Sequence, residues 1–131
     1  MSIIKISVIT ITYNAENVIM RTLDSVLKQT FSNIEHIIID GASKDSTLLA
    51  EREYESRSCS TNNGHEIKII SEPDKGLYDA MNKGIGKATG NYLVFLNAGD
   101  VFPSSSTLET VTDMIGDGEE LPGVLFGDTN I

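Results

Sequence analysis

The sequence predicts an α/β fold with a mostly parallel sheet and helices on both of its faces. Segments of strand character alternate along the chain with segments of helical spacing, the order of βα units joined by right-handed crossovers. The strand segments are apolar at consecutive positions, as in parallel strands buried on both faces. A length of 131 residues with 40% hydrophobic residues fits one domain with an ordinary core.

The first strand and the first helix are expected near the amino terminus. Residues 3–12 are rich in β-branched side chains and predict a strand. Residues 15–29 predict a helix, with Asn14 as a candidate cap. The apolar side chains of this helix share one face: Ile19, Leu23, Val26 and Leu27.

The middle of the chain predicts two further strands around a less regular helix. Ile34–Ile39 form the expected second strand, which ends in the polar segment 40–43. Residues 45–57 predict a charged helix whose register the pattern does not fix. Residues 58–65 are a polar loop to which we assign no chemistry, and Glu66–Ser71 predict the third strand.

The last third of the chain continues the alternation. Residues 76–88 predict the clearest helix, with an apolar face that we interpret as core. Residues 91–96 predict a buried strand, residues 105–115 a helix and residues 123–127 a short final strand.

Polar clusters follow four of the predicted strands. These clusters are residues 12–14, Asp40, residues 71–76 and the segment 97–100, which closes the run FLNAGD. In open parallel sheets, ligands bind beyond the carboxyl ends of the strands, so we expect these clusters to form one rim. The alternative for each cluster is a turn, because Asn, Gly and Asp tolerate the backbone angles that turns require.

The acidic balance of the chain indicates a metal site rather than a basic phosphate site. The net charge of -9 disfavours nucleic acid as a partner. Residues 84–90, GIGKATG, fit neither a P-loop nor a dinucleotide motif, and we expect them to end a helix and form a turn. A diphosphate ligand would then need Mg²⁺ or Mn²⁺, for which the Asp100 carboxylate is a suitable ligand. Asp40 is expected to accept a hydrogen bond from a base or ribose, or to cap the helix near Asp45.

Other reactive side chains are expected to be structural. His36 and His65 have no carboxylate or cysteine neighbours at metal-ligand spacing. Cys59 is the only cysteine and lies in a polar stretch, so we expect an inert thiol. The sequence has no apolar run long enough for a membrane span and no secretion signal, which favours a cytoplasmic location.

Three segments in this order resemble family 2 glycosyltransferases with the Rossmann-like GT-A fold. They are SVITITYNAENVIMRTLDSVLKQTF, IEHIIIDGASKDST and SEPDKGLYDAMNKGIGKATGNYLVFLNAGD. The similarity covers about residues 5–128, and the third segment looks most like the colanic-acid-type bacterial polysaccharide glycosyltransferases. On this resemblance, residues 1–131 form the amino-terminal, nucleotide-sugar-binding domain and stop before the acceptor-binding half.

The resemblance implies that a sugar is transferred from a nucleotide-diphosphate donor to a saccharide or lipid-linked acceptor. The reaction is expected to be inverting, to depend on Mn²⁺ or Mg²⁺ and to serve cell-surface polysaccharide synthesis, with possible association at the inner face of the membrane. The general base is expected beyond Ile131, so no residue here is assigned as the base, and the chain alone is expected to be poorly active. The alternative is a nucleotide-binding or regulatory module that performs no transfer.

The resemblance also assigns site residues. Asn97–Asp100 occupy the position of a DXD-type motif, where Asp100 meets the metal and is the sole carboxylate, since Asn97 and Gly99 stand where acidic residues are common. The expected nucleotide contacts are Thr12, Tyr13, Asn14, Glu16, Asp40, Asp74 and Asn97. Asn14 and Glu16 have helix initiation as their alternative role, and Asp74 has a turn.

Two departures from the family pattern affect the expected nucleotide contacts. Gly41 follows Asp40 where many relatives have a second acidic residue, which leaves the nucleotide preference open. Met81 stands where many relatives have an arginine, so the diphosphate charge would be neutralised by metal. Lys75 and Lys83 are further candidates to lie beside the diphosphate.

Overall fold

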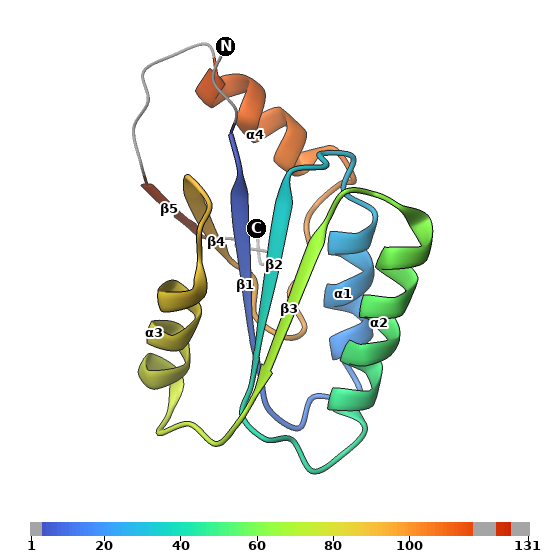
Figure 1. The fold of residues 1–131 in the computed structure, drawn as a ribbon, viewed down its shortest axis with the longest axis vertical. Helices are drawn as coiled ribbons and strands as arrows, with labels where there is room; N and C mark the ends of the chain where they lie inside the picture. Colours follow the sequence, from blue (N-terminus) through green and yellow to red (C-terminus); the bar gives the residue numbers. More distant parts are fainter. Residues whose placement is uncertain (1–3, 117–122, 127–131) are drawn as a thin grey trace.

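The computed structural model describes residues 4–116 and 123–126, which form a five-stranded parallel sheet flanked by helices (Figure 1). The strand order is β3-β2-β1-β4-β5. The strands are β1 (Ile6–Thr12), β2 (Ile34–Asp40), β3 (Glu66–Ser71), β4 (Tyr92–Phe95) and β5 (Gly123–Phe126). The helices are α1 (Ile19–Leu27), α2 (Thr47–Thr61), α3 (Leu77–Lys87) and α4 (Thr107–Gly116). The predicted α/β fold is therefore confirmed.

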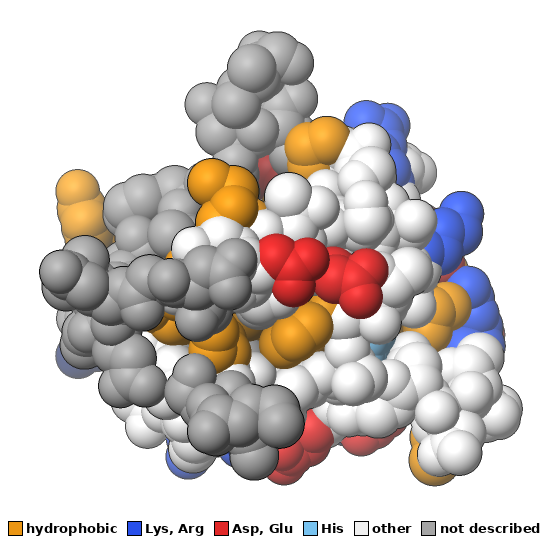
Figure 2. Space-filling model, turned by 90° about the horizontal axis from the view of Figure 1, so that it is seen from above, with side chains coloured by type: hydrophobic (Ala, Val, Ile, Leu, Met, Phe, Trp, Pro, Cys, Tyr) orange, Lys and Arg blue, Asp and Glu red, His pale blue; other side chains and the backbone are white. Residues whose placement is uncertain are grey.

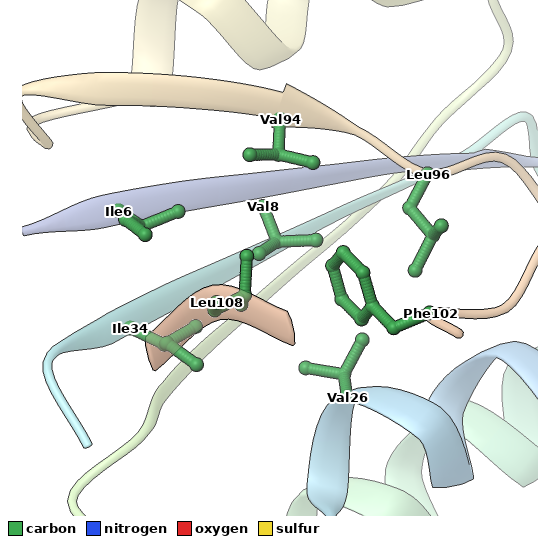
Figure 3. Close-up of a cluster of buried hydrophobic side chains, with 8 residues drawn as sticks. All are labelled: Ile6, Val8, Val26, Ile34, Val94, Leu96, Phe102 and Leu108. Atoms are coloured by element: carbon green, nitrogen blue, oxygen red, sulfur yellow. The ribbon is translucent and has the colours of Figure 1, made fainter. Parts of the chain in front are cut away.

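The helices form a layer on each face of the sheet. On one face, Ala80 of α3 packs against β1 and β2 through Ile9, Ile37 and Ile39. On the other face, α1 and α4 cover the apolar cluster shown in Figure 3, in which Val26 and Leu108 meet side chains of the strands. The cluster consists of Ile6, Val8, Val26, Ile34, Val94, Leu96, Phe102 and Leu108.

The largest differences from the predicted helices are at the start of α1 and the end of α2. Helix α1 begins at Ile19 instead of residue 15, and Val18 at its N-cap makes no side-chain capping hydrogen bond. Asn14 is therefore not the cap of this helix. Helix α2 continues to Thr61, so half of the predicted polar loop is helical, and Asn62 ends the helix in a left-handed conformation. The predicted final strand extended to Gly127, which lies outside the described residues.

The register of α2 was uncertain because the buried face of this helix is polar. Its buried side chains are Thr47, Glu51, Tyr54 and Ser58. The Tyr54 hydroxyl and His36 Nδ1 form a hydrogen bond of 2.6 Å, and Thr10 Oγ1 and His36 Nε2 form another of 2.7 Å. Burial lowers the pKa of His36 to about 3, so the imidazole is neutral at pH 7. The structural role predicted for His36 is confirmed.

Segment 84–90 ends a helix as predicted, and one of its glycines has in addition a packing role that was not predicted. Gly84 and Gly86 lie inside α3, which continues to Lys87, and only the residues after it form a turn. A Cβ atom at Gly84 would lie 2.5 Å from Ile9 Cγ2 on β1. Gly84 is therefore needed for the close approach of α3 to the sheet.

Replacing Gly84 with alanine is expected to destabilise the protein by about 1–3 kcal/mol, because the added methyl group overpacks a tight contact. Gly86→Ala is the matched control: it lies on the same helix, and a Cβ there meets nothing within 4 Å. The control should be neutral or slightly stabilising, since alanine has the higher helix propensity. Urea unfolding of both variants measures the difference. Equal stabilities would contradict the packing role.

The two ends of the sheet differ in character. The carboxyl ends of the strands lie at the bottom of Figure 1, and α4 lies at the opposite end. Figure 2 looks onto the α4 end, where acidic side chains lie in the middle and lysine and arginine lie towards the edges. The described part of this face therefore carries no central basic patch, in agreement with the acidic balance of the sequence.

Candidate functional site

The predicted rim exists, because parallel pairing brings the strand ends to one edge of the sheet. Thr12 pairs with Asp40, and Asp40 pairs with Ser71. Backbone hydrogen bonds continue this register into the loops: Gly41 N donates to Thr12 O at 3.0 Å, Glu72 N to Asp40 O at 3.0 Å, and Ala98 N to Ile11 O at 3.2 Å. Loops that are distant in sequence therefore lie side by side.

A cleft of about 390 Å³ opens between three of these loops. Tyr13 and Asp74, two of the predicted nucleotide contacts, both line it. Tyr13 is 57% exposed, so its aromatic ring is accessible. The remaining lining residues are Gly41, Ala42, Lys44 and Pro73.

Gly41 makes room for Asp74 and Tyr13 in this cleft. A Cβ atom at position 41 would lie 2.9 Å from Asp74 Oδ2 and 3.3 Å from Tyr13 Cδ1. The backbone N–H of Gly76 donates to Asp74 Oδ1 at 3.2 Å, which fixes the carboxylate from the other side. Asp74, in the loop between β3 and α3, therefore supplies the acidic group beside Gly41 in the cleft.

Asn14 and Glu16 join the loop after β1 to the loop after β2. Asn14 Oδ1 accepts a hydrogen bond from Lys44 N at 2.8 Å, and Asn14 N donates to Ser43 Oγ at 2.9 Å. Glu16 Oε1 accepts from Ser46 N at 3.4 Å. These contacts give both side chains a structural role beside the cleft, and their contact with a nucleotide stays a prediction.

Asp40 is completely buried and holds the loop that follows it. Its carboxylate accepts hydrogen bonds from Ser43 N at 2.8 Å, Ser43 Oγ at 2.7 Å and Ser71 Oγ at 3.0 Å. None of these donors belongs to the first turn of α2, where Asp45 Oδ1 instead accepts from Thr47 N at 2.9 Å. The capping role considered for Asp40 is wrong. A direct nucleotide contact by Asp40 stays a prediction and would require the loop to move.

The loop 97–100 lies beyond β4, next to the end of β1. Asp100 N donates to Asn97 O at 2.9 Å, and Asp100 Oδ2 accepts from Asn97 N at 3.3 Å. Gly99 has φ +98°, a left-handed conformation that favours glycine, and its N–H donates to Thr22 Oγ1 at 2.7 Å. Thr12, the remaining predicted contact, is buried.

The residues around Asp100 fit a cation only in combination with a ligand. No three His, Cys, Asp or Glu side chains among residues 4–116 and 123–126 are placed to hold a metal ion together. A dication at Asp100 would take its other oxygen ligands from a diphosphate and from water. This is the usual coordination of Mg²⁺ in phosphate-transfer sites, where one or two carboxylates suffice.

The two predicted lysines have different surroundings. Lys83 Nζ donates to Pro73 O at 2.9 Å and lies 3.4 Å from Glu72 Oε1, so it ties α3 to the loop that lines the cleft. Lys75 is exposed, and its backbone N–H donates to Asp79 Oδ2 at 2.8 Å. Lys44, which sequence reasoning missed, is the lysine that lines the cleft. Its position just after the DGAS turn was the only available signal.

An open α/β sheet with a cleft at its carboxyl edge defines the class of proteins that bind ligands beyond their strand ends. The sequence model of glycosyl transferase family 2 matches residues 7–124. The chain belongs to this family.

Relatives agree with this assignment. The chain is similar to a PGL/p-HBAD biosynthesis glycosyltransferase of Mycobacterium bovis, with 36% identity over 122 residues that make up 93% of the chain and 45% of the relative. It is also similar to glycosyltransferase GlyA of Streptococcus pneumoniae, with 33% identity over 96 residues, or 73% of the chain and 13% of GlyA. The chain thus spans less than half the length of these relatives.

Solved structures show the same GT-A fold. S. aureus TarS 1-349 in complex with UDP-GlcNAc superposes with a TM-score of 0.72 and 27% identity over 86% of this chain and 31% of TarS. Mannosyltransferase PcManGT from Pyrobaculum calidifontis, in complex with GDP-Man and Mn²⁺, superposes with a TM-score of 0.73 and 27% identity over 87% of this chain and 33% of the other. No helix of the described chain is both long and apolar enough to span a membrane.

Proposed function

We propose that this chain binds the nucleotide-diphosphate sugar for a glycosyl transfer reaction. The observation that supports this most directly is the cleft at the carboxyl edge, which combines an accessible aromatic ring at Tyr13 with the carboxylate of Asp74. The ring presents a face on which a base can stack, and the carboxylate accepts hydrogen bonds from N–H groups of a base or hydroxyls of a ribose. The family membership and the nucleotide sugars bound by two structural neighbours support the same function.

The transfer is proposed to depend on Mg²⁺ or Mn²⁺ at Asp100. When bound, the dication stabilises the negative charge that develops on the departing diphosphate. The carboxylate holds the cation at the rim, and the loop 97–100 orients the carboxylate through its bond with Asn97. We propose inversion at the anomeric carbon, a saccharide or lipid-linked acceptor, and a general base outside residues 1–131, in cell-surface polysaccharide synthesis at the cytoplasmic side of the membrane.

Isothermal titration calorimetry with UDP and with GDP tests the binding function. Each nucleotide is measured in Mn²⁺ and in excess EDTA. Binding of at least one nucleotide that is lost in EDTA is expected. If neither nucleotide binds in Mn²⁺, the proposed function is wrong. The alternative, a regulatory module, predicts the same binding but no sugar transfer by a protein that spans the full length of its relatives.

Replacing Gly41 with alanine is expected to weaken nucleotide binding about fivefold, the equivalent of one hydrogen bond of about 1 kcal/mol. The added methyl group displaces the Asp74 carboxylate, whose Oδ2 lies 2.9 Å from the new atom. Because the displaced group is the end of a flexible side chain, stability should change by less than about 0.5 kcal/mol. Calorimetry measures the affinity. In an Asp74→Ala background the effect of Gly41→Ala should vanish, and a persisting effect would show that Asp74 does not mediate it.

A further inference from the structure

A pair of buried carboxyl groups lies directly behind the cleft. Asp40 at the end of β2 and Glu51 in the middle of α2 both have 0% of their surface exposed, and the Glu51 carboxyl group lies within hydrogen-bonding reach of Asp40. Glu51 lies on the polar face of α2 described above, one turn before Tyr54. Two carboxylates cannot both be ionised at close range in a buried site, so the pair shares one proton.

Hydrogen bonding assigns that proton to Glu51. Asp40 accepts three hydrogen bonds from Ser43 and Ser71, so both of its carboxylate oxygens already meet donors. Neither oxygen of Glu51 meets a donor among the described residues. A buried carboxylate without donors is strongly disfavoured, whereas a protonated Glu51 can donate its own O–H to Asp40.

The electrostatic surroundings agree with a neutral Glu51. The pKa of Glu51 is raised to about 9, chiefly by burial and next by the neighbouring Asp40. Asp45 also raises this pKa, whereas Arg52 lowers it. The other elements that face this layer present uncharged groups. These are Thr12 on β1, the neutral His36 on β2, Ile67 and Ile69 on β3, and Ile19 and Leu23 on α1.

Hydrogen bonds connect the Asp40 carboxylate to the loops that form the cleft. The carboxylate binds Ser43, and Ser43 Oγ accepts from the backbone N–H of Asn14, which directly follows Tyr13. Asn14 has φ +47° and Ala42 has φ +63°, left-handed conformations that non-glycine residues rarely adopt. Such conformations persist only where surrounding contacts enforce them, so both loops depend on this hydrogen-bond network.

We propose that Glu51 is a positioning residue for the cleft. In its neutral form it fixes the Asp40 carboxylate against Ser43 and thereby holds the loops that carry Tyr13, Gly41 and Ala42. The consequence for nucleotide affinity rests on the proposed function, whereas the effect on the loops does not.

The first test compares Glu51→Gln, which is neutral at every pH and close in shape, with the wild-type protein and with Glu51→Ala. Backbone amide exchange is followed at Asn14 and Ser43, with Thr89 at the other end of the sheet as the internal reference. Glu51→Ala should accelerate exchange at Asn14 and Ser43 at least about tenfold relative to Thr89. Glu51→Gln should preserve protection at both amides. Equal acceleration in both variants, or at all three amides, would overturn the proposal.

The second test uses pH, to which a merely space-filling side chain would not respond. A group whose pKa is raised on folding contributes stability that is fully present below its ordinary value near 4.5 and is lost as pH rises through about 9. The wild-type melting temperature should therefore fall between pH 6.5 and pH 9. Glu51→Gln should lack this fall and melt at least about 5 °C higher at pH 8. Parallel melting profiles would refute a protonated Glu51.

The third test measures UDP and GDP affinity with Mg²⁺ at pH 6.5 and pH 9. At pH 9 the wild type should bind severalfold more weakly than Glu51→Gln. Because both proteins are measured at the same pH, titration of the nucleotide itself does not affect this ratio of affinities. Equal affinities at both pH values would overturn the link to the cleft. If neither protein binds nucleotide while the amide-exchange result holds, the proposed function fails and the role of Glu51 in fixing the loops is supported.

Discussion

Replacing Asp100 with asparagine is expected to remove the metal dependence of nucleotide binding. Asparagine keeps the shape of the side chain and can still accept a hydrogen bond from Asn97 N, so the loop should retain its conformation. It lacks the negative charge, however, and two unit charges about 4 Å apart interact by about 4 kcal/mol at an effective dielectric constant of about 20. Affinity in Mn²⁺ should therefore fall on the order of 1000-fold.

The measurement is calorimetric titration with UDP and GDP, with and without Mn²⁺. Asp113→Asn is the matched control, because it makes the same change at an exposed site on α4, at the opposite end of the sheet. The control should bind nucleotide like the wild type. If Asp100→Asn retains the full benefit of Mn²⁺, the cation is held elsewhere and the assignment of Asp100 is wrong.

The sheet and the rim of the site were predictable because local patterns determine them. Buried parallel strands have consecutive apolar residues, and the segments before Asp40 and Asn97 show this pattern in the sequence and lie in the predicted strands. Once the strands are parallel, their carboxyl ends must meet. The grouping of Tyr13, Asp40 and Asp74 near one edge follows from topology alone.

The start of α1 was not predictable, because contacts distant in sequence determine it. Asn14 is a good helix cap by local criteria. In the folded chain its side chain binds Lys44 N and its N–H binds Ser43 Oγ, about thirty residues away. These long-range contacts hold the loop after β1 in a left-handed turn, so the helix begins only at Ile19.

The importance of α2 was missed for a different reason. Periodicity analysis searches for an apolar face, and α2 buries Thr47, Glu51, Tyr54 and Ser58. A glutamate in a charged helix is normally solvent-exposed, so nothing distinguished Glu51 from Glu53 or Glu55. The missing apolar face was itself the signal, because a helix of an α/β fold must bury one face against the sheet or a neighbouring helix.

Replacing Glu35 with alanine is expected to cause the largest loss of stability in this protein, about 3–5 kcal/mol. The carboxylate is completely buried and connects four parts of the fold. It accepts hydrogen bonds from Ser7 Oγ on β1 and Lys68 Nζ on β3, both at 2.6 Å, and from Thr89 N and Oγ1 before β4, at 2.8 and 2.9 Å. Glu35→Gln should lose about 1–3 kcal/mol, because the amide satisfies only some of these donors.

Acid unfolding distinguishes the charge of Glu35 from its packing. Burial raises the pKa of Glu35, but hydrogen bonds from Lys68, Ser7 and Thr89 outweigh this effect and lower it to about 2. A lowered carboxyl pKa contributes stability that is present above the ordinary value near 4.5 and is lost as pH falls towards 2. The stability of Glu35→Gln, measured by urea unfolding, should therefore depend less on pH over this range. Parallel profiles would contradict a buried, ionised Glu35.

Three buried groups with large pKa shifts predict the main trend of wild-type stability with pH. His36, which is neutral when folded, destabilises the folded state as pH falls from about 6.5 to 3, because the unfolded chain binds a proton there. Glu51 has the opposite effect between about 4.5 and 9, so the two cancel between about pH 4.5 and 6.5. The free energy of unfolding should be highest in this range and decline by at most about 1.4 kcal/mol per pH unit towards pH 9. Below pH 4.5 it should fall about twice as steeply, because His36 and Glu35 act together there. A maximum above pH 7 in urea unfolding would show that Glu51 is ionised in the folded protein.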